Sequence, residues 1–124
     1  MREENNIRKN HYYKIGTAYE EQAVLFLEKE GYEILERNFH SYHGEIDIIA
    51  REDEYLVFVE VKYRRAAYPG AALAAVTPAK QKRIRQTAEY YLYSRHYSGM
   101  DIPCRFDVVA FEGKKITHLK NAFM

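Results

Sequence analysis

Residues 55–63 constrain the fold more than any other segment of this chain. They read Tyr-Leu-Val-Phe-Val-Glu-Val-Lys-Tyr, and this density of β-branched and aromatic side chains is typical of a buried strand. Residues 44–50 precede them and alternate, so that Ile46 and Ile48 are expected on one face of a second strand. The polar residues 51–54 between the two segments indicate a turn. The pair is therefore predicted to form a hairpin.

The rest of the chain supplies helices and further strands around this hairpin. An apolar stripe of helical period predicts a helix over residues 13–30, and Gly31 is placed to end it. Thr77 and Pro78 are typical of the start of a second helix, because threonine caps helices and proline fits the first turn. Further strands are expected at residues 32–42, 105–111 and 115–119. The predicted order is α-β-β-β-α-β-β, an α/β fold with a mixed central β-sheet flanked by helices.

The length of 124 residues fits one domain. Residues 1–12 are polar and are expected to form a flexible N-terminus, which assigns the single domain to residues 13–124. No apolar stretch approaches the roughly 20 residues needed to cross a bilayer, so no membrane partner is expected. The single cysteine, Cys104, excludes an internal disulfide and is expected to be buried. A reducing, cytoplasmic location is therefore expected.

Charge is balanced overall but unevenly distributed along the chain. The formal net charge is +1, yet residues 45–60 are mainly acidic and residues 78–95 are mainly basic. Neighbouring patches of opposite sign suit a protein that holds a cation and a polyanion together, and two ordinary solvated faces are the alternative explanation. The candidates for contacts with nucleic-acid phosphates are Arg64, Lys80, Lys82, Arg83 and Arg85.

The predicted hairpin also carries charged side chains in a specific spacing. Glu60 and Lys62 are two residues apart on one strand and therefore share a face. If the turn is centred on residues 52–53, Asp47 is a diagonal neighbour of Glu60 on that face, roughly 7 Å away. The register must have this parity, because a slip of one residue would move Asp47 to the opposite face.

Two carboxylates at that separation repel each other unless a cation lies between them. Mg²⁺ suits such a pair, because it takes hard oxygen ligands and keeps water or substrate phosphate in its other positions; Mn²⁺ is the second candidate ion. A bound ion activates water and neutralises charge on a phosphodiester, and Lys62 on the same face could stabilise the transition state. The pattern is therefore typical of metal-assisted phosphodiester hydrolysis, with a solvent-exposed hairpin face as the alternative.

Two further polar residues are candidates for different roles. Gln81 falls within the apolar stripe of the second helix, where a glutamine needs a polar partner. The edge of the sheet that carries the predicted site could supply that partner, which makes Gln81 a candidate catalytic residue. Asp107 follows Arg105 by two residues and is expected to pair with an arginine rather than to bind a metal.

Several blocks of the sequence together resemble a known family. They are Gly-Tyr at 31–32, Ile-Leu-Glu-Arg-Asn-Phe at 34–39, Gly-Glu-Ile-Asp-Ile-Ile-Ala at 44–50, Leu-Val-Phe-Val-Glu-Val-Lys-Tyr-Arg at 56–64, Lys-Gln-Lys-Arg-Ile at 80–84 and Cys-Arg-Phe-Asp-Val-Val at 104–109. These blocks resemble the YraN-type uncharacterised proteins, which are small, mostly bacterial predicted endonucleases. The resemblance implies the restriction-endonuclease-like PD-(D/E)XK fold, related in shape to archaeal Holliday-junction resolvases.

The resemblance also implies a site and an activity. Carried over by residue, the implied site is Asp47, Glu60 and Lys62, with Glu20 on the first helix as a further acid. Asp47, Glu60 and Glu20 are then the metal ligands, although Glu20 also fits an ordinary exposed helix carboxylate. The implied function is a metal-dependent DNA endonuclease, with branched or otherwise structured DNA as a candidate substrate. The alternative is a non-catalytic nucleic-acid-binding or protein-interaction module with a nuclease-like fold.

Two segments add expectations of their own. Tyr19 stands where the family often has glycine, and its ring could crowd Glu20 or change its aim. Residues 64–76 are expected to form a long loop. Because nuclease domains of this size often act on two strands as dimers, a homodimer with contacts in this loop is a further expectation by analogy.

Overall fold

A five-stranded mixed sheet organises the molecule. The computed structural model describes the backbone of residues 2–64, 70–97 and 101–124, and side chains within these ranges except those of residues 2–15 and 72–73. The described elements, in chain order, are α1 (Arg2–Lys29), β1 (Glu33–Ser41), β2 (Gly44–Glu52), β3 (Tyr55–Arg64), α2 (Ala71–Ala74), α3 (Pro78–Ser94), β4 (Cys104–Glu112) and β5 (Lys115–Phe123). The predicted α/β fold and its order of elements are confirmed, with α2 as an addition.

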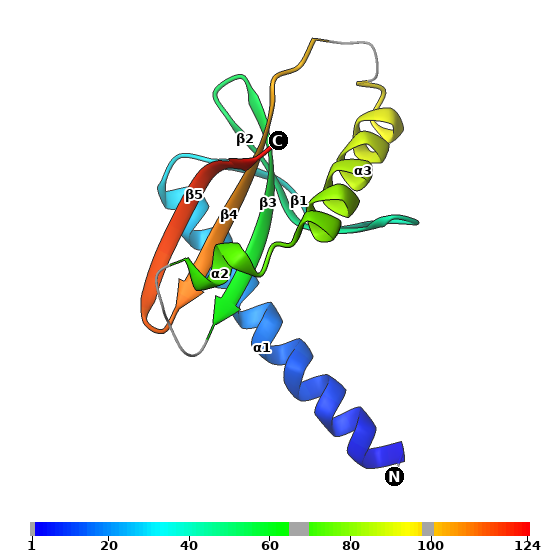
Figure 1. The fold of residues 1–124 in the computed structure, drawn as a ribbon, viewed down its shortest axis with the longest axis vertical. Helices are drawn as coiled ribbons and strands as arrows, with labels where there is room; N and C mark the ends of the chain where they lie inside the picture. The colour runs from blue at the N-terminus through cyan, green and yellow to red at the C-terminus, as the bar shows by residue number, and fades with distance from the viewer. Residues whose placement is uncertain (1, 65–69, 98–100) are drawn as a thin grey trace.

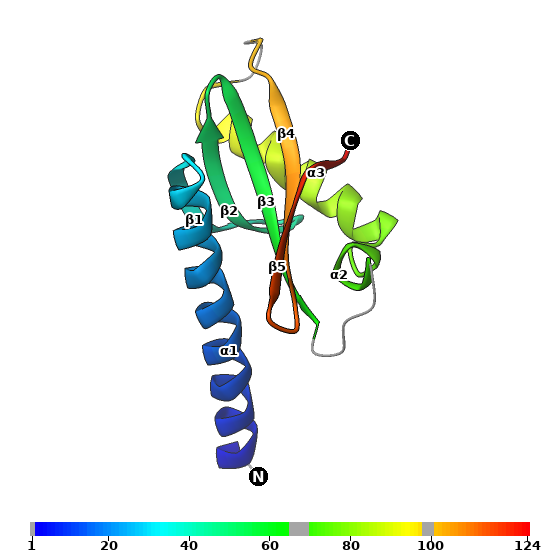
Figure 2. The same cartoon turned by 90° about the vertical axis from the view of Figure 1, so that its left-hand side faces the viewer.

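The strands lie side by side in the order in which they occur along the chain. Neighbours are antiparallel except β3 and β4, which are parallel. The chain returns between these two strands through α2 and α3, as a parallel pair requires. Figure 2 shows the resulting layers, with α1 on one side of the sheet and α2 and α3 on the other.

The helices differ from their predicted bounds in two places. The first begins at Arg2 rather than at residue 13. Residues 65–69 of the predicted long loop lie outside the described residues, and the part that follows contains α2, an Ala-Ala-Leu-Ala turn. Four residues are too few for a periodic pattern, so helix propensity alone could have indicated α2. In the described part of the chain, no helix is long and apolar enough to span a membrane.

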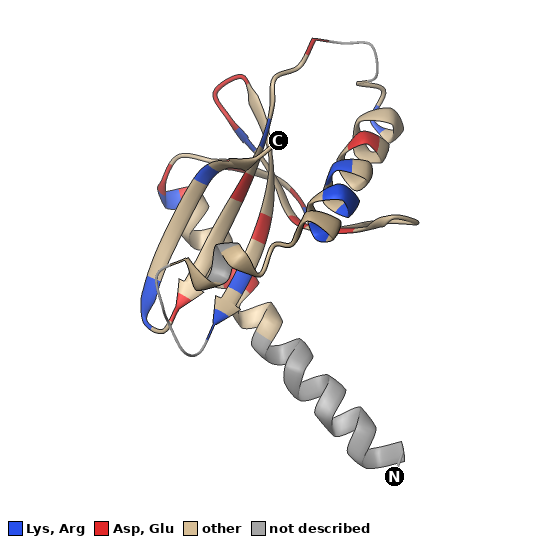
Figure 3. Ribbon diagram, in the orientation of Figure 1, with Lys and Arg blue, Asp and Glu red and all other residues tan. Residues whose placement is uncertain are grey.

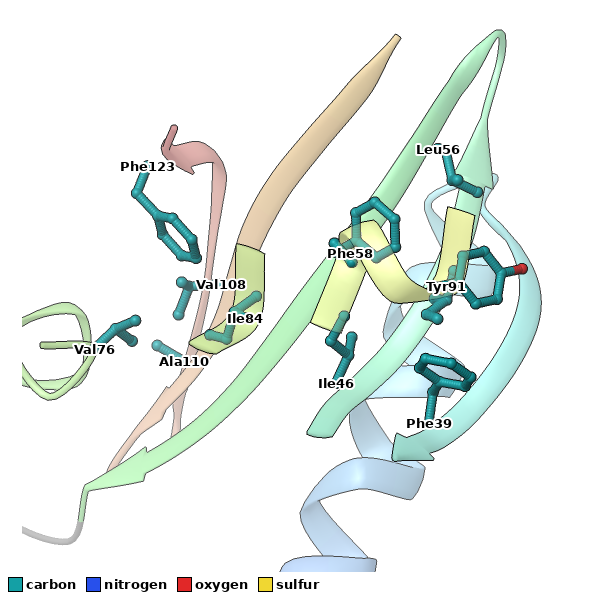
Figure 4. Close-up of a cluster of buried hydrophobic side chains, with 12 residues drawn as sticks. Phe39, Ile46, Leu56, Phe58, Val76, Ile84, Tyr91, Val108, Ala110 and Phe123 are labelled. Atoms are coloured by element: carbon teal, nitrogen blue, oxygen red, sulfur yellow. The ribbon is translucent and has the colours of Figure 1, made fainter. Parts of the chain in front are cut away.

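Each face of the sheet has its own apolar core. On the α3 side, Ile84, Ala88 and Tyr91 form the predicted inward stripe and pack against Phe58 and other apolar side chains of the sheet (Figure 4). On the α1 side, the helix contributes its buried apolar residues to a second cluster on the opposite face. Cys104, expected in a core, is exposed, because it is the first residue of β4 and precedes the covered part of the strand.

Strand β2 departs from the predicted alternation. Ile46 and Ile48, expected on one face, belong to different cores: Ile46 packs on the α3 side and Ile48 on the α1 side. On the neighbouring strand β1, Asn38 has a φ of 52°, in the left-handed region. The pairing places Arg37 beside Ile48 and Phe39 beside Ile46, so both strands change face around Asn38. The prediction of one shared face for the two isoleucines is therefore wrong.

The register of the hairpin has the predicted parity but a different turn. The pairing of β2 with β3 runs from Glu52 and Tyr55 to Ile48 and Val59. The turn is thus centred on residues 53–54 rather than 52–53, and continuing the register would place Asp47 opposite Glu60 instead of diagonal to it. The pairs described for these strands end at Ile48, whereas β2 continues to pair with β1 as far as Gly44. A fork therefore opens between β2 and β3 (Figure 1).

Candidate active site

A cavity of about 320 Å³ lies at the fork between β2 and β3. Its charged lining residues come from α1, β2, β3 and the first turn of α3: Glu20, Glu45, Asp47, Glu60, Lys62 and Lys80. The structure thus brings together the four residues that the family resemblance implies. Figure 3 shows the surrounding distribution of charge, with basic residues on the first turns of α3 and acidic stretches on the central strands.

Asp47 lies in the wall of the cavity and is only 8% exposed. Its Oδ2 accepts a hydrogen bond from the backbone N–H of Val61 at 2.8 Å, just beyond the last described pair of the two strands. The side chain therefore satisfies a strand N–H where the two strands have separated. Burial and the negative charge of Glu60 raise the pKa of Asp47 from 3.8 to about 8, against the opposing effect of the Val61 hydrogen bond.

Glu60 is buried on β3 and is held by two lysines. Alternation along β3 places Glu60 and Lys62 on the α3 side with Phe58, as predicted. Glu60 Oε1 lies 3.3 Å from Lys62 Nζ and 2.9 Å from Lys80 Nζ. One carboxylate oxygen therefore faces two ammonium groups, one from its own strand and one from the helix opposite.

The two lysines respond differently to this environment. Burial lowers the pKa of Lys62, and the neighbouring Lys80 lowers it further. For Lys80, burial also acts downward, but the hydrogen bond with Lys62 and attraction to Glu60 outweigh it and raise the pKa. Lys62 therefore loses its proton more readily than Lys80.

Sequence reasoning placed Lys80 among the phosphate contacts and missed its position in the cavity. A signal was present: Lys80 precedes Ile84 by four residues, so it extends the inward stripe of α3 by one turn. Thr77 caps the helix as predicted, accepting a hydrogen bond from the Lys80 backbone N–H at 3.2 Å. The cap fixes the first turn against the end of β3 that carries the site.

Glu20 is partly buried on α1 and lines the cavity. Burial raises its pKa; a hydrogen bond with Asn38 opposes this, while the charge of Glu45 adds to it. The ring of the preceding Tyr19 is stacked on Tyr63 of β3, with ring centroids 4.3 Å apart. This stacking holds the ring against the sheet, and Glu20 still reaches the cavity.

Gln81 is not among the residues that line the cavity. Its side-chain Nε2 donates to the backbone oxygen of Val76 at 3.0 Å, in the segment that leads into α3. The glutamine does have the polar partner that its position requires, but the partner comes from the helix start and not from the sheet edge as predicted. Its geometry is that of a residue that stabilises the helix start.

The other predicted basic residues do not line the cavity. Lys82 and Arg83 are exposed on α3, and Arg83 lines a neighbouring groove. Arg64 Nη1 donates to the Tyr63 backbone oxygen, and Arg85 Nη1 donates to the backbone oxygen of Met124, both at 2.8 Å. Lys82 and Arg83 are consequently the ones with the clearest access to an incoming phosphate.

A separate polar cluster surrounds Asp107 on β4. Its fully buried carboxylate accepts from Arg105 Nε at 2.9 Å and from the Asn121 backbone N–H at 3.0 Å, and it lies 2.8 Å from His118 Nε2. The predicted pairing of Asp107 with an arginine is confirmed. Burial acts to raise the pKa of Asp107, but the bonds to His118 and Arg105 outweigh it and lower the pKa. The cluster ties β4 to β5.

The donors in the cavity fit a hard divalent cation with few protein ligands. Among the described residues, no three His, Cys, Asp or Glu side chains form a ready metal-binding group. Asp47 and Glu60 nevertheless supply buried carboxylate oxygens, and the pKa of Asp47 is raised by burial and by the charge of Glu60, so a bound cation would favour its charged form. Mg²⁺ keeps several waters and needs only one or two carboxylates, so this donor set suits it.

The fold and the cavity define an α/β domain with a charged site at a fork in its sheet, and the comparisons identify its family. The model of the Uncharacterised protein family UPF0102 matches residues 19–111, and the chain belongs to this family. The matched region contains every charged residue of the cavity named above.

Its relatives are similar over most of their length. A UPF0102 protein of Janthinobacterium sp. (strain Marseille) is 48% identical over 107 residues, covering 86% of this chain and 85% of the relative. A UPF0102 protein of Lachnoclostridium phytofermentans is 48% identical over 108 residues, 87% of this chain and 91% of the relative. The UPF0102 protein YraN of Escherichia coli (strain SMS-3-5 / SECEC) is 47% identical over 109 residues, 87% of this chain and 82% of the relative. The resemblance to YraN-type proteins is confirmed.

Proposed function

We propose that this protein is a Mg²⁺- or Mn²⁺-dependent endonuclease that hydrolyses phosphodiester bonds in DNA. The observation that carries the proposal is the convergence of Asp47, Glu60 and Lys62 in one cavity at the sheet fork. The YraN-type resemblance, which implies the same three residues, supports it. Branched or otherwise structured DNA is the first substrate class to test.

The metal ligands in this proposal are Asp47 and Glu60, with Glu20 on α1 as a further acid in the same cavity. When bound, a divalent ion would neutralise charge that develops on the phosphodiester and lower the pKa of a coordinated water. The Val61 N–H holds one oxygen of Asp47 in place, which leaves the other oxygen to bind. Such fixing of a ligand by its neighbours strengthens a metal site.

The remaining groups of the site act on the phosphodiester and the water. Hydrolysis forms a bond from the water oxygen to phosphorus and breaks the bond to one sugar oxygen. Lys62 Nζ, beside Glu60, can orient the attacking water and stabilise the additional negative charge. The exposed Lys82 and Arg83 lie where they can position the DNA backbone without reading its sequence.

The direct test is incubation with duplex, nicked, flapped, junction and single-stranded DNA in Mg²⁺, Mn²⁺ or EDTA. We expect metal-dependent cleavage that falls by about 100-fold or more in Lys62→Ala and Asp47→Ala. Lys114→Ala, on the exposed turn between β4 and β5, is the matched control and should cleave normally. Cleavage at the full rate in both site variants would assign the activity to a contaminant or to another site.

The exposed basic residues of α3 favour one second candidate, a module that binds nucleic acid without cutting it. In that case DNA binding weakens steeply with salt, and the substrate stays intact after long incubation with metal. Lys82→Ala and Arg83→Ala would each reduce the log–log salt slope by about 1. Loss of both binding and cleavage would favour a protein-interaction role.

A further inference from the structure

Lys80 borders two hollows of the molecule. One is the cavity that contains Asp47 and Glu60, and the other is a groove of about 230 Å³ between the tip of the β1–β2 hairpin and the first turns of α3. The groove is lined by Gly44, Glu45, Lys80, Arg83 and Ile84. Its basic members, Lys80 and Arg83, give it the charge that a phosphate of a nucleic-acid backbone requires.

The backbone of Lys80 is fixed, whereas its side chain is long and partly exposed. Its N–H is held by the Thr77 cap at 3.2 Å, and the next residue, Gln81, donates its N–H to the Thr77 backbone oxygen at 2.8 Å. The side chain of Lys80 is 35% exposed, compared with 16% for Lys62, which extends from the middle of the sheet. Four flexible bonds therefore carry the ammonium group from a fixed point that lies beside both hollows.

The ammonium group of Lys80 lies against the Glu60 oxygen that would bind a metal ion. Its Nζ lies 2.9 Å from Glu60 Oε1, closer than Lys62 Nζ at 3.3 Å. A divalent cation bound to Glu60 would repel an ammonium group at this distance, and the partly buried position would strengthen the repulsion. The ammonium group can move into the groove beside Arg83, because Lys80 also lines that groove.

We infer that Lys80 is a displaceable internal counter-ion that couples the metal site to the groove. It neutralises Glu60 while no divalent ion is bound, and its ammonium group turns to the groove and binds a backbone phosphate when an ion takes Glu60. This inference rests on the proposed function and names Lys80 as a positioning residue for it. Metal and DNA then bind cooperatively, and each must tighten the other by the same factor.

The first test measures binding of Mn²⁺ alone, by calorimetry and without DNA, in wild type and Lys80→Gln. Removal of the competing ammonium group should tighten Mn²⁺ binding by about 5-fold, a typical coupling between interacting sites. Lys114→Gln, at an exposed lysine on the β4–β5 turn outside the cavity, should leave the affinity unchanged. Thermal melts of each variant verify folding. Equal affinity in Lys80→Gln and wild type would overturn the inference.

The second test measures binding of fluorescent DNA in EDTA and in Ca²⁺, at constant ionic strength. Wild type and Lys114→Gln should bind DNA more tightly in Ca²⁺ than in EDTA, and this ratio of affinities should be clearly smaller in Lys80→Gln. Lys80→Arg, which keeps the charge, should restore part of the coupling. The same ratio in Lys80→Gln and wild type would contradict the role of Lys80.

These measurements separate the inference from the proposed activity, because neither requires cleavage. Coupling that depends on Lys80 in a protein that cuts no substrate would support the inference and count against the endonuclease. Failure of the wild type to bind Mn²⁺ would overturn both. Normal cleavage combined with Mn²⁺ binding that is insensitive to Lys80 would overturn the inference alone.

Discussion

The backbone N–H of Val61 donates to Asp47 Oδ2 at 2.8 Å and thereby joins β2 to β3 at the point where they separate. This hydrogen bond holds the Asp47 carboxyl group in surroundings that disfavour its charged form. Burial and Glu60 raise the pKa of Asp47 to about 8. The arrangement is typical of a functional site, where charge is placed at a cost in stability.

We expect Asp47→Asn to stabilise the metal-free protein. The native carboxyl keeps its proton up to a pH near 8, whereas in the unfolded chain it loses the proton near 3.8, so wild-type stability falls as pH rises between these values. Asparagine does not titrate and can still accept from Val61. Thermal melts in EDTA should show an advantage for Asp47→Asn that grows from pH 5 to pH 8, reaching at least about 1 kcal/mol. An advantage that does not change with pH would contradict this explanation.

Glu20 should contribute to metal binding, whereas its neighbour Glu21 should not. Glu20 lines the cavity, but Glu21 pairs with Arg37 at 2.8 Å on the exposed side of α1. We expect Glu20→Gln to weaken Mn²⁺ binding by about 10-fold. Glu21→Gln is the matched control; it removes only an exposed ion pair, which contributes about 1 kcal/mol or less to stability. Equal Mn²⁺ affinities in the two variants would leave Glu20 as an ordinary helix carboxylate.

Asp107 should make the protein sensitive to acid. Its pKa is lowered in the folded state, so it stabilises the fold above its unfolded pKa near 3.8, and this stabilisation is lost as pH falls through the lower folded value. Asp107→Asn removes one of the two carboxylates that pair with Arg105, the other being Glu52 at 3.0 Å, and should cost about 2 kcal/mol at pH 7. Urea unfolding at pH 7 and pH 3 measures the difference from wild type, which should shrink at the lower pH. A constant difference would refute the ionic origin.

Gly31 should be required for the end of α1. It has a φ of 94°, and the Tyr32 N–H donates to the Leu27 backbone oxygen at 2.9 Å, as in a helix that ends in a left-handed residue. Gly31→Ala should lower the free energy of unfolding by about 1 kcal/mol, because a Cβ disfavours this conformation. Gly16→Ala, within the helix and with open space around an added Cβ, should have the opposite sign. Urea unfolding measures the free energy of unfolding of both variants. A lower value in both would contradict the conformational explanation.

The sequence predicts the strands and helices well where a local pattern is complete. The hairpin strands, the Thr77 cap and the stripe of α3 follow from alternation, capping chemistry and helical period, and all three are present. The parity of the β2–β3 register could be predicted as well, because the opposite parity would reverse the faces of both strands. These features depend on residues close together in the sequence.

Features that depend on distant contacts could not be predicted in the same way. The change of face in β2 coincides with a left-handed Asn38 on the strand beside it, and nothing in residues 44–50 alone indicates it. Lys80 is predicted only as a phosphate contact, because its pairing with Glu60 joins a helix to a strand and leaves no local pattern in the sequence. Asp47 lies near Glu60 in the cavity, as predicted. The cause is the fork between β2 and β3, and not the diagonal pairing of Asp47 with Glu60 that the prediction assumed.

The parallel pairing of β3 with β4 makes the site dependent on a part of the chain that supplies none of its proposed residues. The pairing begins with Leu56 and Cys104, which are far apart in the sequence. A fragment that stops before β4 keeps Asp47, Glu60, Lys62 and Lys80 but exposes the edge of β3, which is prone to pair with other chains. The contacts between β3 and β4 form late in folding, because the long chain segment that connects these strands must close first. The carboxylates and lysines of the cavity should therefore be assembled only after the last two strands have been synthesised.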